Sequence, residues 1–493
     1  MENSHQVNLT FFGGINEIGG NCVLLEDAGY DVKLIIDFGI NFDKYFNHFH
    51  GEDPFTLQEL IKVRLIPKKS EPKLKNLYSK HYLFNPSKKS RQQKVAECQH
   101  QTDPPTDIDG VLISHPHRDH YYGLPLLNRN IPIYTGATTR KIILAHYDSS
   151  RYQMDNFYEG LQWRVFRTGN VIEKKGMKIT PVHVDHSIPG AYGFIFETSA
   201  GVIVYSGDFR MHGPLSWMTA DLIRKAREIT GEESRVKGLI CEGTFIHKGS
   251  IESEAAVKRQ LKTLFRDMPF DYVLVKYDRV DWDRFRTYAH IAKRFQWNYI
   301  ITEKDAYFYY LLNSKDPHPT MRDPDIQQDD HILILSDGKA RFPWQQKIRR
   351  IFENLGKEER LIEYKDLRGL KGHFFLYLTS LYRLIKDNLP LHLKGVFIAS
   401  TIDPYAEEFR DNTKTIQHLL LEKNIPAYRI LASGHAKPHD IYKFVKGIDP
   451  ETLIPVHTQH PALFKKLLEE ETTKVLLPDD DLGAFEVKYG SEG

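Results

Sequence analysis

Four side chains able to bind a metal ion follow directly on the apolar run at residues 111–113: His115, His117, Asp119 and His120. Imidazole nitrogen and carboxylate oxygen suit zinc and similar cations. His115 and His117 are two residues apart, so an extended backbone sends both side chains to one face. Asp119 and His120 follow after the chain has turned. The spacing indicates a loop holding two metal ions, the arrangement used for in-line displacement at phosphorus. The alternative is a histidine-rich surface loop that binds nothing.

A second set of candidate ligands follows two later apolar runs. Residues 177–182 read as a strand that ends at His183 and His186, and either histidine could bind a metal. Residues 202–206 read as a strand followed by Asp208. A carboxylate at the end of a buried strand is often only a capping group.

Three more polar groups follow apolar runs further along the chain. Glu242 follows the predicted strand at residues 236–240, His435 follows residues 430–432, and His457 follows residues 453–456. A carboxylate placed like Glu242 can simply accept hydrogen bonds from backbone amides.

Composition bounds the class of protein. The 493 residues suggest two to four domains. A formal charge of +2 means that affinity for nucleic acid must come from local patches. Three scattered cysteines argue against a disulfide framework or a thiolate cluster. With no signal region and no run long enough to cross a bilayer, we expect a cytoplasmic protein without membrane contact.

The N-terminal part of the chain and its later part differ in the predicted order of strands and helices. Short strands at residues 7–12, 22–25 and 32–36, with glycine-rich turns, predict an antiparallel sheet. A helix is predicted at residues 138–147. Later strands alternate with helices such as residues 282–295, which predicts a largely parallel sheet. The predicted domains are residues 1–213, an inserted domain at 214–420, and a return to the first domain at 421–493.

The region from about 43 to 105 differs from its surroundings. Residues 62–94 contain eleven lysines and arginines opposed only by Glu71, with Tyr78, Tyr82 and Phe84 between them. A solvated charged face is one reading of this segment. Basic residues interleaved with stackable rings also suit single-stranded nucleic acid, which is the other reading.

The motifs resemble those of a known superfamily. The His-x-His-x-Asp-His pattern of residues 115–120, and Ser-Gly-Asp-Phe-Arg at 206–210, resemble metallo-β-lactamase signatures. Residues 13–21 resemble the opening motif of ribonuclease J-type proteins. The motifs at Glu242, His435 and His457 resemble motifs A, B and C of the β-CASP group. The resemblance implies a metallo-β-lactamase four-layer αββα sandwich with an inserted α/β β-CASP domain.

The resemblance also implies a ligand set for two zinc ions, although manganese could serve the same ligands. Asp208 would bridge both metals. His183 is left with a supporting role, because the family pattern places the ligand just before Ser-x-Pro. One metal would be held by His115, His117 and His186, and the other by Asp119, His120 and His457.

The same resemblance implies a catalytic scheme. A metal-bridged hydroxide would attack the RNA backbone in a cleft between the two domains, with Asp119 and Asp208 among the catalytic residues. His435 would contact the phosphate or protonate the leaving oxygen, oriented by Glu242. Ser433 and the amides around Gly434 would cradle the phosphate. The histidine at 457 points to RNA, since DNA-acting relatives tend to carry valine there.

The activity implied is that of a zinc-dependent RNA phosphodiesterase, endonuclease and/or 5′–3′ exonuclease, with single-stranded RNA as the favoured partner. Ribonuclease J usually carries a C-terminal assembly domain, and this chain ends soon after His457. We therefore expect a ribonuclease J-like protein without that domain, in which homo-oligomerisation lacks its usual support. The alternatives are hydrolysis of a small substrate, a DNA-acting nuclease of the same family, and a binding subunit without catalysis.

Overall fold

The computed structural model describes most of the chain as two compact units. The first unit consists of Met1–Arg140, Ser150–Ile251 and Gly434–Gly493, and the second of Lys141–Ser149 and Glu252–Ser433. The described residues are 5–50, 56–79, 103–149, 158, 160–231, 233–249, 252–268, 270–314, 319–378, 386–390, 392–400, 407–478 and 485–490.

The first sheet of the first unit mixes antiparallel and parallel strands. Its strands, in spatial order, are β21 (Phe485–Tyr489), β1 (Val7–Gly13), β2 (Cys22–Asp27), β3 (Val32–Ile36), β4 (Gly110–Ile113), β5 (Pro132–Gly136) and β6 (Gln162–Phe166). β21, β1, β2 and β3 pair antiparallel, which confirms the predicted antiparallel sheet at the N-terminus. From β3 to β6 the pairing is parallel.

The second sheet faces the first. Its strands, in spatial order, are β20 (Lys474–Val475), β19 (Pro450–Val456), β11 (Val236–Glu242), β10 (Gly201–Tyr205), β9 (Tyr192–Thr198), β8 (Met177–His183) and β7 (Ile172–Lys174). One hydrophobic cluster contains side chains from both sheets, among them Leu9, Leu34, Phe194 and Ile454, all inaccessible to solvent. Burial of this apolar surface holds the two sheets together.

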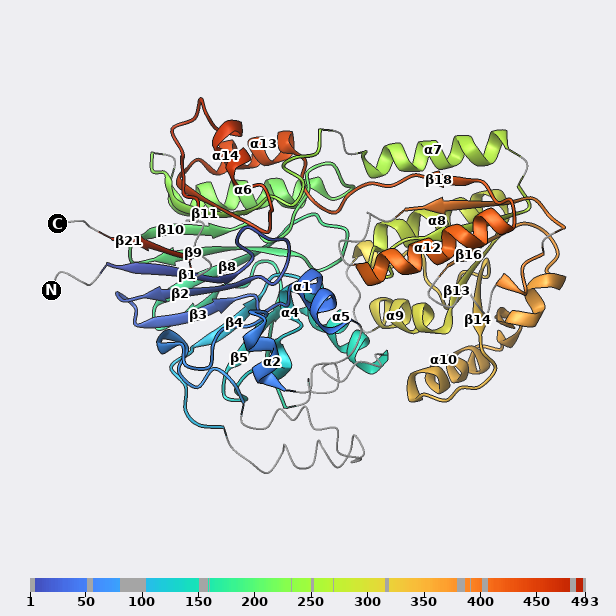
Figure 1. Ribbon diagram of the computed structural model, residues 1–493, viewed down its shortest axis with the longest axis horizontal. Helices are drawn as coiled ribbons and strands as arrows, with labels where there is room; N and C mark the ends of the chain where they lie inside the picture. The colour runs from blue at the N-terminus through green and yellow to red at the C-terminus, as the bar shows by residue number, and fades with distance from the viewer. Residues whose placement is uncertain are drawn as a thin grey trace. The chain divides into compact units, whose positions relative to one another are not determined.

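Helices cover the sheets of this unit. Those lying wholly within it are α1 (Phe42–Phe49), α2 (Leu57–Lys62), α4 (Arg118–Tyr121), α6 (Ser216–Thr230), α13 (Pro438–Ile448) and α14 (Ala462–Leu467), with short 3-10 turns at η1 (Pro72–Leu74) and η2 (Leu124–Leu126). α6, α13 and α14 pack against the outer face of the second sheet, while α1, α2 and α4 lie along the first (Figure 1). The predicted αββα sandwich is confirmed.

The second unit is built on one parallel sheet, as the alternating pattern predicted. Its strands, in spatial order, are β15 (Leu361–Glu363), β14 (Ile332–Ser336), β13 (Asn298–Thr302), β16 (Phe374–Tyr377), β12 (Tyr272–Lys276), β17 (Gly395–Ala399) and β18 (Ala427–Arg429). Every pairing between them is parallel. Its helices are α7 (Glu254–Asp267), α8 (Trp282–Phe295), α9 (Glu303–Asn313), α10 (Pro343–Asn354) and α12 (Glu407–Glu422), with η4 (Pro319–Met321), η5 (Glu358–Arg360) and η6 (Tyr364–Gly369).

Helix α8 shows how local sequence sets these elements. Asp281 accepts a hydrogen bond from the Arg284 amide and caps the first turn. Buried residues at helical spacing, including Phe285, Tyr288 and Ile291, face the sheet. Gln296 adopts the left-handed conformation that ends the helix. The observed bounds match the predicted helix at 282–295. The helix predicted at 138–147 is α5 (Ala137–Ser149), along which the division between the units falls.

The domains 1–213, 214–420 and 421–493 stay a prediction. The division into compact units falls after Arg140, after Ser149, after Ile251 and after Ser433. β11 belongs to the first unit because it pairs with β10 and β19 in the second sheet of that unit. The sequence pattern therefore changes at residue 213, one helix and one strand before the chain passes into the second unit after Ile251.

The basic segment is described only in part. Tyr82, Phe84 and everything else from 80 to 94 lie outside the described residues, so the choice between the two readings of this segment stays a prediction. In the described part, Lys73 donates to Glu486 at 2.6 Å. No helix among the described residues combines the length and the apolar character needed to cross a membrane.

Candidate metal centre

The candidate residues follow strands that end at one edge of the first unit. β10, β11 and β19 are parallel neighbours, so their carboxyl ends lie together and deliver Asp208, Glu242 and His457. β8, two antiparallel steps from β10, points the same way and leads to His186. β4 of the facing sheet ends before the histidine loop, whose last three residues open α4. The structure therefore brings together residues that are far apart in the sequence.

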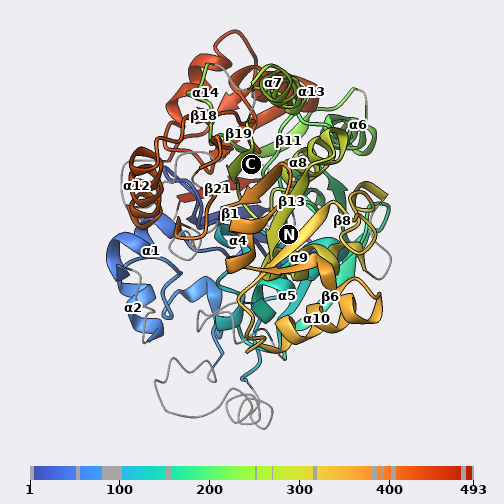
Figure 2. The ribbon, with the colours of Figure 1, turned by 90° about the vertical axis from the view of Figure 1, so that its right-hand side faces the viewer.

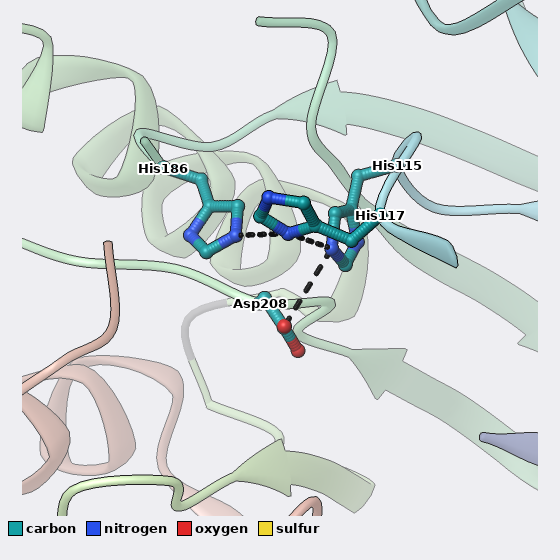
Figure 3. A group of neighbouring side chains, drawn as sticks. All are labelled: His115, His117, His186 and Asp208. Carbon is teal, nitrogen blue, oxygen red and sulfur yellow. Dashed lines mark hydrogen bonds and ion pairs between the residues drawn. The ribbon is translucent and has the colours of Figure 1, made fainter. Parts of the chain in front are cut away.

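The first group contains three histidines and one carboxylate: His115, His117, His186 and Asp208. His117 Nδ1 lies 3.0 Å from His115 Nε2 and 3.0 Å from His186 Nε2. His115 Nε2 lies 3.6 Å from Asp208 Oδ2. Figure 3 shows the three rings and the carboxylate turned toward one another.

The second group contains Asp119, His120 and His457. Asp119 Oδ2 lies 3.0 Å from His457 Nε2 and 3.8 Å from His120 Nε2. Asp208 Oδ2 is 3.3 Å from His120 Nε2 and 3.8 Å from His457 Nε2, so this one carboxylate oxygen borders both groups.

The donor set fits metal ions. His186 Nδ1 must carry its proton to donate to the Gly434 carbonyl at 2.6 Å, so Nε2 of the neutral ring presents a lone pair to His117. Asp208 is only 2% exposed, and its Oδ2 lies 3.3–3.8 Å from nitrogens of four histidines: His115, His120, His435 and His457. Converging ring nitrogens around a buried carboxylate are ligands of the kind that zinc takes.

Burial and charge act on the pKa values in opposite directions within the cluster. Burial lowers the pKa values of His115 and His186 well below their usual range, and neighbouring imidazoles add to the effect. Burial would also lower the pKa of His120, but the carboxylates of Asp208, Asp119 and Asp37 raise it well above that range. The pKa values of Asp119 and Asp208 are held low against burial by neighbouring histidines. Both carboxylates are therefore ionised and suited to cations.

Exposure differs sharply within the cluster. His115 and His120 are inaccessible, while the side chains of Asp119 and His435 are 24% and 15% exposed. Solvent reaches the groups from the side of Asp119 and His435.

Asp37 supports the cluster and was not singled out from the sequence. Its carboxylate accepts from His120 Nδ1 at 2.8 Å, from the Ser114 hydroxyl at 2.7 Å and from the Tyr205 hydroxyl at 2.7 Å. It is fully buried with φ 57°, a conformation uncommon for a residue other than glycine. A carboxylate behind a ligating histidine fixes the ring and its tautomer. Its position directly after β3 was the sequence feature that could have identified it.

Thr244 supports His457 in the same way and was also missed. Its hydroxyl lies 2.7 Å from His457 Nδ1, which leaves Nε2 directed at Asp119. His457 itself has φ 54°, and its amide donates to the Gly14 carbonyl at 2.7 Å. The left-handed backbone directly after β19 aims the imidazole.

Glu242 combines the two readings that the sequence left open. Its carboxylate accepts from the Thr244 amide at 2.9 Å and the Phe209 amide at 3.3 Å, as a strand-end carboxylate does. It also lies 3.3 Å from His435 Nδ1. Burial would lower the pKa of His435, but Glu242 raises it through its charge and the hydrogen bond. His435 also lies in a third group with Asp208 and His457.

The remaining candidates lie around these groups. Gly434 contributes its carbonyl to His186, and Ser433 is the last residue of the second unit. His183 bonds the Thr168 hydroxyl at 2.7 Å, stacks on Tyr192, and belongs to none of the three groups. The structure thus places His186 in the cluster and His183 outside it.

Two glycines allow the chain to approach Asp119. A Cβ on Gly39 would lie 1.6 Å from the Asp119 carbonyl oxygen, and one on Gly19 would lie 2.8 Å from Asp119 Oδ2. Gly19 also has φ +80°. The glycine-rich segment at 13–21 therefore does more than make a turn, because it packs against a candidate ligand.

Two family descriptions match parts of the chain. Residues 80–229 match a beta-lactamase superfamily domain, and residues 425–478 match a Zn-dependent metallo-hydrolase RNA specificity domain. The first range contains the histidine loop, His186 and Asp208, and the second contains His435 and His457.

Curated relatives and a solved structure extend the similarity. Ribonuclease J of Mycoplasma pneumoniae is 23% identical over 96% of this chain and 71% of its own length. Ribonuclease J of Pyrococcus abyssi is 24% identical over 95% and 94%. Ribonuclease J of Helicobacter pylori is 26% identical over 54% of this chain, a match that spans only 32% of the relative. A crystal structure of a protein of unknown function from Enterococcus faecalis shares the fold, with a TM-score of 0.71, 22% identity and coverage of 98% and 100%.

The two facing sheets of the first unit and the side-chain groups at the ends of their strands fit a metallo-β-lactamase domain, into which an α/β domain is inserted. Over most of its length the chain is similar to proteins named ribonuclease J, in keeping with the resemblance of its motifs to those of the β-CASP group.

Proposed function

We propose that this protein is a metal-dependent RNA phosphodiesterase. The observation that carries the proposal is the convergence of seven side chains from four strand ends, with the buried Asp208 between the two groups, within a chain that also matches an RNA specificity domain. His115, His117 and His186 would hold one zinc ion, Asp119, His120 and His457 a second, and Asp208 would border both. Zinc bound here would supply an ionised water near neutral pH and polarise a phosphoryl oxygen.

His435 would act as the proton donor to the leaving oxygen. Its Nδ1 faces Glu242 at 3.3 Å, so Nε2 is the atom that would give up the proton. Glu242 raises the pKa of this imidazole, which keeps more of it protonated near neutral pH. The partial exposure of His435 and Asp119 allows a substrate to reach both.

The backbone around Gly434 would position His186, and the amides around Gly434 would also contact the substrate phosphate, as predicted from the sequence. The Gly434 carbonyl accepts a hydrogen bond from His186 Nδ1, which orients that ring toward His117. Contact of Ser433 with a phosphate, and the cleft between domains expected from the sequence, stay predictions.

RNA is favoured over the alternative substrates by the C-terminal part of the chain. The match at 425–478 is to an RNA specificity domain and includes His435 and His457. The relatives similar over most of the chain are named as ribonucleases. Neither observation favours a small-molecule substrate or DNA.

The test is incubation of the purified protein, with its metal content measured, with RNAs labelled at either end and carrying 5′ monophosphate, triphosphate or hydroxyl termini. A matched DNA strand and a generic phosphodiester serve as controls. We expect metal-dependent cleavage of RNA, whose product lengths distinguish endonuclease from 5′–3′ exonuclease action. Failure to cleave any RNA with full zinc or manganese content would overturn the proposal.

A further inference from the structure

Helices α7 and α8 of the second unit lie side by side (Figures 1 and 2). Arg284 of α8 and Glu254 of α7 form a buried ion pair at 3.0 Å that joins them. Beyond this pair, both helices carry cations on their solvent side.

Four of these cations lie on this pair of contacting helices, Lys258 and Lys262 on α7 and Arg286 and Arg294 on α8, and are called the cluster below. Lys258 and Lys262 are one helical turn apart, or about 6 Å along α7. Arg286 and Arg294 are about two turns apart on α8. Lys258, Lys262 and Arg286 are half-buried and Arg294 is exposed. Among the residues that the structure describes, no carboxylate forms an ion pair with any of the four.

Three of the nearby carboxylates are engaged elsewhere, and Asp283 of α8 acts by its charge on Arg284. Glu254 pairs with Arg284, Asp267 pairs with Arg266, and Asp281 caps α8. His290, which lies between Arg286 and Arg294 on α8, pairs with Asp323 at 2.8 Å. The cluster therefore has an excess of positive charge on two adjoining helices.

The cations act on one another. Burial, followed by the positive charges of Lys262, Arg286 and Arg294, lowers the pKa of Lys258. Like charges one helical turn apart disfavour the helix by a few tenths of a kcal/mol. A row of polyanion charges placed along the two helices would relieve this repulsion.

We propose that the α7–α8 surface, defined by Lys258, Lys262, Arg286 and Arg294, binds backbone phosphates of RNA. This inference rests on the proposed function for the choice of RNA as the polyanion. Four cations spread over two helical turns suit successive phosphates of one strand better than a single anion. Contacts to phosphates would add affinity without base preference.

The test compares two double variants that remove the same charge from the same helices. Lys258→Gln with Arg286→Gln removes two cluster cations, and the control Arg266→Gln with Lys293→Gln removes two cations that are paired with Asp267 and Asp329. The Kd for a fluorescent 30-nucleotide RNA is measured by anisotropy across salt concentrations, in an Asp208→Ala background that prevents cleavage. Without that background, hydrolysis of bis-p-nitrophenyl phosphate reports on the metal centre alone.

We expect the cluster variant to bind RNA several-fold more weakly and to lower the slope of log Kd against log salt by about 1.4, or about 0.7 per cation removed. The control should match the parent in Kd and slope, and both should hydrolyse the small diester normally. Lys262→Gln with Arg294→Gln gives an independent second variant, and circular dichroism checks the fold of each.

Equal slopes for the cluster and control variants would overturn the inference. So would loss of binding to phosphatidylserine vesicles with RNA binding unchanged, since the surface would then be a membrane site. If the parent protein binds RNA through this surface but cleaves none, the proposed function fails while the inference stands.

Discussion

In both units, buried polar side chains lie close to the ends of parallel strands. The groups that compensate these side chains differ between the two units. In the second unit, Asp305 is fully buried and bonds Thr302 and the Arg279 guanidinium. Nearby, the hydroxyl groups of Tyr277 and Tyr299 bond each other. In the first unit, nitrogens of four imidazole rings lie 3.3–3.8 Å from Asp208 Oδ2.

The buried carboxylates of the two units differ in how their charge is compensated. A buried carboxylate costs free energy unless a cation or hydrogen-bond donors compensate it. Asp305 obtains both from its own chain. Asp208 lies among rings whose other nitrogens are committed to Asp37, Gly434 and Thr244. The cluster around Asp208 therefore has the donors to accept an added cation, whereas Asp305 is already paired with Arg279.

The largest expected effect is that of Asp208→Asn. The substitution removes the carboxylate that borders both groups, so we expect loss of bound metal and a fall in RNA cleavage beyond the roughly 100-fold typical of supporting residues. Metal content and single-turnover cleavage measure this. The matched control, Asp305→Asn, should lower stability and leave metal content unchanged. Metal retention by Asp208→Asn would refute the contrast.

His435→Ala comes next. Loss of the proton donor should slow RNA cleavage about 10²–10⁴-fold. Because His435 is not assigned as a ligand, metal content should remain that of the parent. Elemental analysis beside the cleavage assay decides the point, and loss of metal would make His435 a ligand in the group that it forms with Asp208 and His457.

Metal removal should affect the two units unequally. Zinc at about 100 times its Kd should stabilise the first unit by about 2.7 kcal/mol, since metal binds only the folded cluster. Hydrogen exchange of peptides covering β11 and β12 measures each unit separately, with and without a chelator. Exchange should rise for β11 and stay constant for β12. An equal rise in both would show that the metal also stabilises the second unit.

Asp37→Asn should have a smaller effect. The amide keeps the shape but loses the charge that holds the His120 ring, so zinc affinity should fall about 10–100-fold. Competition with a chromogenic chelator gives the affinity. Excess zinc should restore much of the cleavage, which distinguishes a positioning residue from a ligand. Cleavage that stays low at saturating zinc would contradict this role.

Tyr299→Phe in the second unit should have the smallest effect. It removes one hydroxyl from the tyrosine cluster, where Tyr277 also lies 3.5 Å from the Tyr309 hydroxyl. The expected loss is about 0.5–1.5 kcal/mol of unfolding free energy, with metal content and cleavage unchanged. Urea denaturation measures it. A loss of activity would mean that the polar cluster of the second unit is not purely structural.

Local pattern predicted much of this fold. Hydrophobic periodicity and turn residues predicted α8, the antiparallel strands β1–β3 and the parallel sheet of the second unit. These sequence features depend only on neighbouring residues in the chain. The unit boundary lies after the change in sequence pattern, because the pairing of β11 with β10 and β19 is a long-range choice. Asp37 and Thr244 escaped notice because each reads locally as an ordinary strand-end residue.

The sequence by itself determined the chemical types of the candidate ligands and their position after buried strands, since apolar runs and residue identities are local properties. Tertiary structure decided which of them meet: His186 rather than His183, with Asp208 between two groups and His457 turned inward by a left-handed backbone. The physical reason is that parallel strands share one carboxyl edge only after pairing, and pairing is set by burial between sheets far apart in the chain.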